Sequence, residues 1–186
     1  MGINRKGHHK ENTTEQLINK EIILKELNIL PGQTIVDVGC GNGYMSKEFS
    51  KLVHHSGKVF SLDCAKEAIE KLKEDTGGTN IEPMEADITR KTPIDDKSAD
   101  LIYLSTVFHI FSKEQIGNFQ KEVKRLLKPN GKLAIIEIQK ENTPFGPPLN
   151  MRFSPEELKQ TIKLKPISLI NVGQYFYMQL FENSKE

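Results

Sequence analysis

The sequence predicts an α/β fold: a three-layer sandwich in which a mostly parallel, seven-stranded, doubly wound sheet is covered by helices on both faces. Short apolar runs alternate with amphipathic stretches, and the runs at 34–38, 58–63, 99–105 and 132–138 are apolar almost throughout. Such runs are typical of parallel strands that are buried on both faces. The last two predicted strands, about 167–172 and 174–181, are joined across Gly173, and a connection this short forces antiparallel pairing. One antiparallel strand is therefore expected near the C-terminus.

Capping signals predict where the helices begin. Capping boxes stand at Thr13–Gln16, Ser112–Gln115 and Ser154–Glu157. The first of these helices is expected to run through about Asn28, and the second to stop at Pro129-Asn130-Gly131. Helical patterns at 44–53 and 64–75 and a weaker strand at 80–86 complete the alternation.

The composition excludes several classes of protein. The 186 residues suit one domain, and 26 basic against 25 acidic residues give a net charge of +1, too little to attract nucleic acid or an anionic membrane. No apolar run reaches the ~18 residues of a spanning helix, and no apolar stretch marks a secretory signal. Cys40 and Cys64 are too few for a disulfide framework. We expect a cytoplasmic chain with a flexible segment at 1–12 and a single domain over 13–186.

The most informative segment is the glycine-rich turn at 36–43, Val-Asp-Val-Gly-Cys-Gly-Asn-Gly. It joins a predicted strand to a predicted helix, and in open α/β sheets ligands bind at the carboxyl ends of strands. Glycines there let the backbone turn sharply and let a ligand approach closely. Asp63 follows the next strand, twenty residues beyond Gly43, where a carboxylate can accept hydrogen bonds from ribose hydroxyls. Asp63 also suits the N-cap of the helix at 64–75, and the two roles are compatible.

The turn differs from the dinucleotide fingerprint G-x-G-x-x-G. Counted from Gly39 or from Gly41, the sixth position holds Tyr44 or Ser46 rather than glycine. Asp37, just before the turn, would repel a pyrophosphate but suits an ammonium group. A nicotinamide-dependent oxidoreductase is therefore disfavoured, and a cationic nucleoside ligand is favoured.

Taken together, the motifs resemble those of class I S-adenosylmethionine-dependent methyltransferases. The glycine-rich turn resembles the first motif of that family, and Glu85-Ala86-Asp87-Ile88 resembles its segment after the third strand. Residues 100–105 resemble the fourth-strand motif, and residues 126–134 resemble the turn into the fifth strand. The resemblance spans about residues 15–181 and is greatest to the small-molecule enzymes of ubiquinone and menaquinone biosynthesis. It implies a Rossmann-like fold and S-adenosylmethionine as cofactor.

The resemblance also implies roles for individual residues. Asp37 would help hold the α-ammonium group, Asp63 the ribose hydroxyls, and Asp87 the adenine amino group. The remaining implied cofactor-binding positions are Gly39, Cys40, Gly41 and Gly43 in the turn, Cys64 beside the adenine face, Ile88 through its backbone N–H, and Ser105 through its backbone near the methionine amine.

His109 is the candidate catalytic residue, because it lies four residues beyond Ser105 on a loop that should face the methyl group. Imidazole titrates near neutrality and suits a general base, which is needed only when the acceptor must lose a proton. A half-buried histidine at a helix start is the alternative. Adjacent His8 and His9 do not share a helix face as metal ligands do, so no metal is predicted. Arg152 would pair with an acidic acceptor or lie in a surface ion pair.

The predicted function is methyl transfer to a small-molecule acceptor by in-line displacement at the sulfonium methyl. The alternatives are a methyltransferase acting on RNA or protein, and a non-catalytic S-adenosylmethionine-binding protein. Near-zero net charge disfavours RNA. Acceptor contacts in this family lie on variable loops, so the motifs leave the acceptor and the oligomeric state open.

Overall fold

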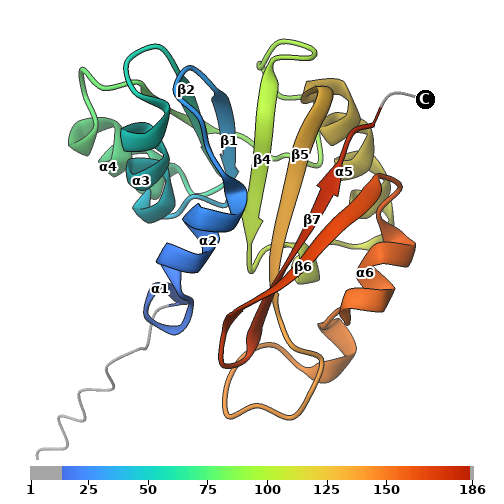
Figure 1. Ribbon diagram of the computed structural model, residues 1–186. Helices are drawn as coiled ribbons and strands as arrows, with labels where there is room; N and C mark the ends of the chain where they lie inside the picture. The colour runs from blue at the N-terminus through green and yellow to red at the C-terminus, as the bar shows by residue number, and fades with distance from the viewer. Residues whose placement is uncertain (1–13, 185–186) are drawn as a thin grey trace, which may run out of the picture.

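A single seven-stranded sheet organises the computed structural model, which describes residues 14–184 (Figure 1). The strand order is β3-β2-β1-β4-β5-β7-β6. The strands are β1 (Thr34–Val38), β2 (Lys58–Asp63), β3 (Ile81–Glu85), β4 (Ala99–Ser105), β5 (Leu127–Ile138), β6 (Lys165–Gly173) and β7 (Phe176–Glu182). The segment 1–12, expected to be flexible, lies outside the described residues.

The direction of the strands agrees with the predicted fold class. β1 to β5 pair in parallel, whereas β7 is antiparallel to both of its neighbours, β5 and β6. One antiparallel strand near the C-terminus is thus confirmed. β3 lies at the edge of the sheet, which accommodates Pro83 because an edge strand has one side free of ladder hydrogen bonds.

Helices cover both faces of the sheet. They are α1 (Thr14–Leu17), α2 (Lys20–Leu27), α3 (Tyr44–Val53), α4 (Lys66–Asp75), α5 (Lys113–Leu126) and α6 (Pro155–Thr161), with short 3-10 turns η1 (Phe108–Ile110) and η2 (Leu149–Met151). Buried side chains of α2 and α3 form one apolar cluster with the sheet, and those of α5 and α6 form another on the opposite face. No helix in the described part of the chain is long and apolar enough to cross a membrane.

Both downstream capping boxes are present, whereas the first predicted helix is interrupted. Ser112 and Ser154 each accept a hydrogen bond from the backbone N–H three residues on, and the Gln115 and Glu157 side chains reciprocate. Near the N-terminus, the prediction of one continuous helix through Asn28 is wrong, because the helix is interrupted between α1 and α2.

Asn19 causes this break. Its side chain accepts a hydrogen bond from the N–H of Ile22 (3.0 Å) and so caps α2, while its own N–H donates to the carbonyl of Val172 in β6. An asparagine offers this alternative to helical hydrogen bonding wherever tertiary structure supplies the backbone partner. The predicted cap at Thr13 lies outside the described residues.

The end of α5 also differs from the prediction. Pro129-Asn130-Gly131 was expected to stop the helix, yet α5 ends at Leu126 and β5 begins at once. The N–H of Asn130 donates to the carbonyl of Asn183, and the N–H of Asn183 donates to that of Gly131. Pairing with the chain beyond β7 therefore draws the proline-containing segment into the sheet.

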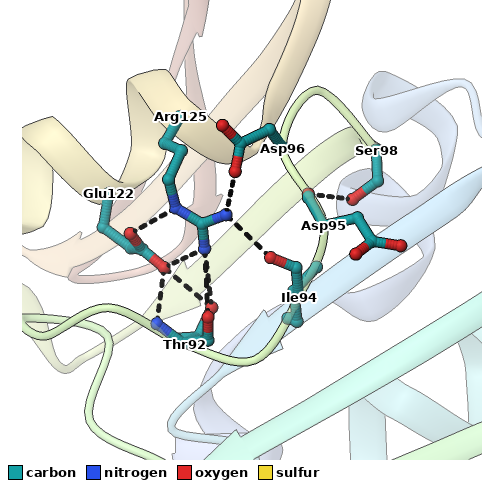
Figure 2. Close-up of polar contacts among 7 residues, drawn as sticks. All are labelled: Thr92, Ile94, Asp95, Asp96, Ser98, Glu122 and Arg125. Atoms are coloured by element: carbon teal, nitrogen blue, oxygen red, sulfur yellow. Dashed lines mark hydrogen bonds and ion pairs between the residues drawn. The ribbon is translucent and has the colours of Figure 1, made fainter.

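Arg125, in the last turn of α5, ties the long β3–β4 connection to this helix (Figure 2). Its guanidinium donates to both carboxylate oxygens of Glu122 (2.9 and 2.6 Å), to Asp96, and to the backbone carbonyls of Ile94 and Thr92. Glu122 is 5% exposed and also accepts from the N–H and hydroxyl of Thr92. This cluster, the Arg125 network, fixes residues 92–96 of the β3–β4 connection against α5.

Candidate functional site

The candidate site lies where the order of the strands reverses. β1 is followed along the chain by β2 on one side of the sheet, whereas the strand on its other side is β4. The connections that leave β1 and β4 therefore run in opposite directions, and open α/β sheets bind ligands at such a switch point. In Figure 1 the arrowhead of β4 marks this edge, and the long connection after β5 lies at the same end.

The glycine turn, 39–43, folds over the end of β2. The N–H groups of Gly39 and Cys40 both donate to the carbonyl of Leu62, at 2.8 and 3.0 Å. Gly39, Gly41 and Gly43 all have positive φ, a conformation that glycine adopts without a steric penalty. The bend is thus fixed by pairing with β2 and permitted by the glycines.

The three glycines have different neighbours. A Cβ at Gly39 would overlap the side chain of Val107, and a Cβ at Gly43 would overlap that of Leu72 in α4. A Cβ at Gly41 would meet nothing within 4 Å. Two glycines therefore allow close packing of the protein on itself, and Gly41 alone presents bare backbone to open space, as a ligand-binding position requires.

Asp63 joins the turn to the next helix. Its Oδ2 accepts from the N–H of Gly41 (2.9 Å), and its Oδ1 accepts from the N–H of Ala65 (2.8 Å) at the start of α4. A carboxylate has about four lone-pair sites, so each oxygen can accept a further hydrogen bond. The predicted N-cap role of Asp63 is wrong, because the N-cap residue of α4 is Ala65 and Asp63 accepts the N–H of that residue instead. The free lone pairs suit ribose hydroxyls.

Asp37 lies beneath the turn rather than on its surface. It is 2% exposed, and it accepts a hydrogen bond from the hydroxyl of Ser46, which in turn accepts one from Ser61. Burial raises the pKa of Asp37 to about 6, although hydrogen bonds from Ser46 lower it in part. A carboxylate this desolvated is stabilised by a nearby cation, which is consistent with an ammonium ligand.

A second buried polar group stands next to Asp37. Tyr103 pairs with Asp37 across β1 and β4, is 1% exposed, and its hydroxyl has no hydrogen-bond partner among the described residues. Burial, and then the charge of Asp37, raise its pKa. A buried hydroxyl without a partner costs about 1–3 kcal/mol, so the pair fits a polar ligand end such as a methionine amine or carboxylate. Sequence patterns gave no reason to single out Tyr103 within an apolar strand.

The residues expected around adenine come together at the ends of β2 and β3. The N–H of Ala86 donates to the carbonyl of Asp63, and the exposed thiol of Cys64 lies 3.7 Å from the carbonyl of Ala86. Burial raises the pKa of the Cys64 thiol, and the charge of Asp87 contributes. Asp87 accepts from Thr89 through both its N–H (2.8 Å) and its hydroxyl (2.7 Å). One oxygen of Asp87 is thereby occupied, while the other faces only the exposed Arg90, at 3.6 Å.

Ile88 and Cys40 are two further members of the predicted set. The Ile88 side chain is 3% exposed and belongs to the core, so only its backbone can serve a ligand, as expected. Cys40 is buried, and desolvation raises the pKa of its thiol. A thiol held protonated in this way is a poor nucleophile, in keeping with a packing role.

Beyond β4, the chain passes Ser105 and reaches His109 in η1. Thr106 has a positive φ of 56°, and its N–H donates to the carbonyl of Ile136 in β5. His109 Nδ1 lies 2.8 Å from a carboxylate oxygen of Glu137, whose side chain is 1% exposed. Glu137 was not among the predicted site residues, and its signal is a single acid within the apolar run Ile135–Ile138.

Arg152 does not lie in the surface ion pair that was one of its two predicted roles. It is 6% exposed and its guanidinium donates only to the chain around it: the carbonyls of Gln139, Glu141, Phe145 and Pro147 and the hydroxyl of Thr143. Backbone and hydroxyl acceptors of the loop after β5 surround the guanidinium, so Arg152 organises this loop, and pairing with an acidic acceptor stays a prediction.

Elsewhere in the described chain lie hollows that contain none of the predicted site residues. Residues 14–184 contain no group of three or more side chains that could hold a metal ion, and His8 and His9 lie outside them. A hollow of about 560 Å³ is lined by α5 and the outer ends of β6 and β7, at the edge opposite the glycine turn. It includes none of the predicted site residues.

The strand order, the reversed β7 and the acid-flanked glycine turn define a class I, Rossmann-like S-adenosylmethionine-dependent methyltransferase domain. Residues 35–131, more than half of the chain, match the methyltransferase domain family, and the chain belongs to that family.

Known relatives agree with this assignment. The structure is similar to that of an S-adenosylmethionine-dependent methyltransferase from Aquifex aeolicus, with a TM-score of 0.81 and 30% identity over 89% of this chain and 90% of that one. The chain is 29% identical over 123 residues to the demethylmenaquinone methyltransferase of Staphylococcus saprophyticus (66% of this chain, 52% of that protein). It is 28% identical over 130 residues to a ubiquinone/menaquinone biosynthesis C-methyltransferase of Hahella chejuensis (68% and 51%). It spans about half the length of these curated relatives.

Proposed function

We propose that this chain transfers a methyl group from S-adenosylmethionine to a small organic acceptor. The observation that carries the proposal is the pairing of the open backbone at Gly41 with two differently placed acids, Asp63 beside it and Asp37 beneath it. A neutral or anionic nucleotide has no positive group to pair with the buried Asp37. A ligand with a ribose and an ammonium group can bind both Asp63 and Asp37.

The cofactor would lie across the carboxyl ends of β1, β2 and β4. In this proposal Asp37 and the hydroxyl of Tyr103 meet the amino-acid end, together with the backbone of Ser105. Asp63 binds the ribose, and Cys64, Asp87 and the backbone of Ile88 surround the adenine. Gly39, Cys40, Gly41 and Gly43 form the wall between these two ends.

Bound S-adenosylmethionine supplies a methyl group already activated by the sulfonium charge. The chain's own task is then to hold the acceptor atom in line with the methyl carbon and sulfur, and to exclude water. Positioning of this kind contributes ~7–11 kcal/mol to catalysis. His109, in η1 after β4, is the proposed catalytic residue that accepts a proton from acceptors that must lose one.

The similarity to a demethylmenaquinone methyltransferase and to a ubiquinone/menaquinone biosynthesis C-methyltransferase supports a small-molecule acceptor of the quinone type. The net charge of +1 supports a small molecule over RNA. A non-catalytic S-adenosylmethionine-binding protein is the second candidate, because the cofactor contacts proposed above would serve binding without transfer equally well.

Calorimetry and a transfer assay test the proposal. S-adenosylmethionine and S-adenosylhomocysteine are expected to bind with micromolar dissociation constants, about 8 kcal/mol, and NADH is not. Methyl transfer is then measured by mass spectrometry over a panel of hydroquinones, phenols, carboxylic acids and amines. Binding without transfer to any of them would favour the non-catalytic protein, and binding of NADH alone would refute the cofactor assignment.

A further inference from the structure

Glu137 is a buried acid that the cofactor site does not explain. It lies near the end of β5 with no exposed surface, between Ile136 and Ile138, which are also buried. An isolated carboxylate in such surroundings is costly unless it is paired and hydrogen-bonded. Its partners therefore indicate what it is for.

Both carboxylate oxygens of Glu137 hold the same residue. Oε2 lies 2.8 Å from Nδ1 of His109, and Oε1 accepts the backbone N–H of His109 at 3.3 Å. One contact fixes the imidazole ring and the other fixes the backbone that carries it. The His109 side chain is 13% exposed, so the protein holds the ring but does not bury it completely.

The pairing determines which ring nitrogen carries the proton. An ionised carboxylate can only accept hydrogen bonds, so Nδ1 must donate. Neutral His109 therefore has its lone pair on Nε2, and no group within residues 14–184 makes a hydrogen bond to Nε2. Nε2 is left available to accept a proton from something outside the chain.

His109 lies close to the glycine turn. Val107, two residues before His109, is the side chain that a Cβ at Gly39 would overlap. η1 also follows β4, which pairs directly with β1. The pair of His109 and Glu137, called the dyad below, therefore lies at the switch point where the methyl group would be presented.

Other titratable groups near Glu137 do not replace His109. Tyr177 lies opposite Glu137 in β7, but its hydroxyl donates to the carbonyl of Phe153 at 2.8 Å. Burial raises the pKa of Tyr177, and the charges of Glu137, Glu157 and Glu156 add to this effect, so it stays protonated. Within the described residues, His109 is the one group paired with Glu137 that can become a cation.

We propose that Glu137 is a positioning residue that makes His109 a general base, and that the acceptor is a molecule that loses a proton on methylation, such as a phenol or hydroquinone. This inference rests on the proposed function. Nε2 takes the proton of the acceptor hydroxyl, and the electron pair freed on the acceptor forms the bond to the methyl carbon. The pair of the broken carbon–sulfur bond returns to sulfur, leaving a neutral thioether and an imidazolium that faces the Glu137 carboxylate.

The tautomer can be measured without any acceptor. Long-range nitrogen-15 spectra of the full chain at about pH 8, where an ordinary imidazole is neutral, should show His109 protonated at Nδ1 and unprotonated at Nε2. Glu137→Ala should abolish this fixed tautomer. A wild-type spectrum with the proton on Nε2 would overturn the dyad, whatever the acceptor is.

Kinetics test the catalytic consequence with reduced 1,4-naphthoquinone as the probe acceptor. His109→Ala should lower kcat by about 10²- to 10⁴-fold, with the KM for S-adenosylmethionine changed less than about twofold. Glu137→Gln, which keeps shape and an acceptor oxygen, should lower kcat at least about 10-fold, and should have no further effect in the His109→Ala background. His55→Ala, an exposed histidine after α3, is the matched control and should retain full activity.

The outcomes separate the two proposals. Absence of S-adenosylmethionine binding by the wild-type chain would refute the proposed function. Binding without methylation of the probe would refute the phenolic acceptor class. An equal loss from Glu137→Gln with and without His109 would assign Glu137 a purely structural role, and thermal unfolding of the variant would confirm that the chain still folds.

Discussion

At the scale of single residues, Asp37 links the ligand to the stability of the fold. Its pKa of about 6 lies above that of an unfolded aspartate, about 3.9, because burial disfavours the charge. The folded state therefore holds the proton more tightly, and stability is lost as pH rises from about 4 to 6. Full ionisation costs about 3 kcal/mol, taking about 1.4 kcal/mol for each unit of pKa.

Asp37→Asn should therefore be more stable than the wild type at pH 8, and this advantage should vanish towards pH 4. Denaturant unfolding at several pH values measures the difference. The same variant should bind S-adenosylmethionine more weakly, because the ammonium group loses its counter-charge. Asp75→Asn, at an exposed site beside Lys47, is the control and should show neither effect. A variant that is less stable at pH 8 would contradict the assigned cost of burial.

Tyr103→Phe should separate ligand binding from stability in a similar way. The hydroxyl is buried without a partner in the described chain, so its removal should leave the free energy of unfolding unchanged or raise it by about 1 kcal/mol. If the hydroxyl meets the amino-acid end of the cofactor, the affinity should fall by about fivefold, one hydrogen bond. Melting and calorimetry on the same sample measure both. Loss of stability with unchanged affinity would assign Tyr103 to the core alone.

At the scale of elements, the glycine turn combines packing and binding at alternate positions. Gly43→Ala would force a Cβ against Leu72 and separate α3 from α4, so it should cost more than the about 1–2 kcal/mol of backbone strain at positive φ. Gly41→Ala incurs only the backbone strain at positive φ, but it places a methyl group in the open space beside the turn. Thermal melting should rank Gly43→Ala as the less stable variant, and Gly41→Ala should lose more cofactor affinity than its stability explains.

The Arg125 network holds the β3–β4 connection to α5. Burial would raise the pKa of Glu122, but hydrogen bonds from Arg125 and Thr92 outweigh it and lower the pKa, so the carboxylate is charged. Arg125→Ala would leave that charge without its cation and should destabilise the fold by about 3 kcal/mol, measured by denaturant unfolding. Lys66→Ala, which breaks an exposed ion pair to Glu70, should change stability by less than about 0.5 kcal/mol. Equal losses of stability in Arg125→Ala and Lys66→Ala would contradict the prediction that the buried ion pair contributes more than the exposed one.

At the scale of the whole molecule, features that depend on residues close together in the sequence could be predicted, whereas features that depend on distant residues could not. The strand alternation, the reversed last strand and the capping boxes follow from local patterns. The break at Asn19 depends on a carbonyl in β6, and the run of β5 from Leu127 depends on pairing beyond β7. Glu137 with His109, and Arg152 with its loop, are likewise contacts between residues that the local pattern does not connect. The motif residues could be predicted because they lie in one turn and at the ends of neighbouring strands, where short sequence patterns identify them.

Ligand binding should be visible in the stability of the whole fold. A ligand at 100 times its dissociation constant adds about 2.7 kcal/mol to the folded state. For a chain of this size, each kcal/mol raises the melting temperature by about 2–4 °C, so S-adenosylhomocysteine should raise it by about 5–10 °C. NADH should leave it unchanged.

Asp63→Ala tests where this stabilisation comes from. The variant loses the hydrogen bonds to the N–H groups of Gly41 and Ala65, so its own melting temperature should fall. The decisive quantity is therefore the ligand-induced shift, which should largely disappear if Asp63 binds the ribose. In His109→Ala the same shift should be retained in full, because the dyad acts on the acceptor and not on the cofactor. A shift that survives Asp63→Ala but is lost in His109→Ala would reverse these two assignments.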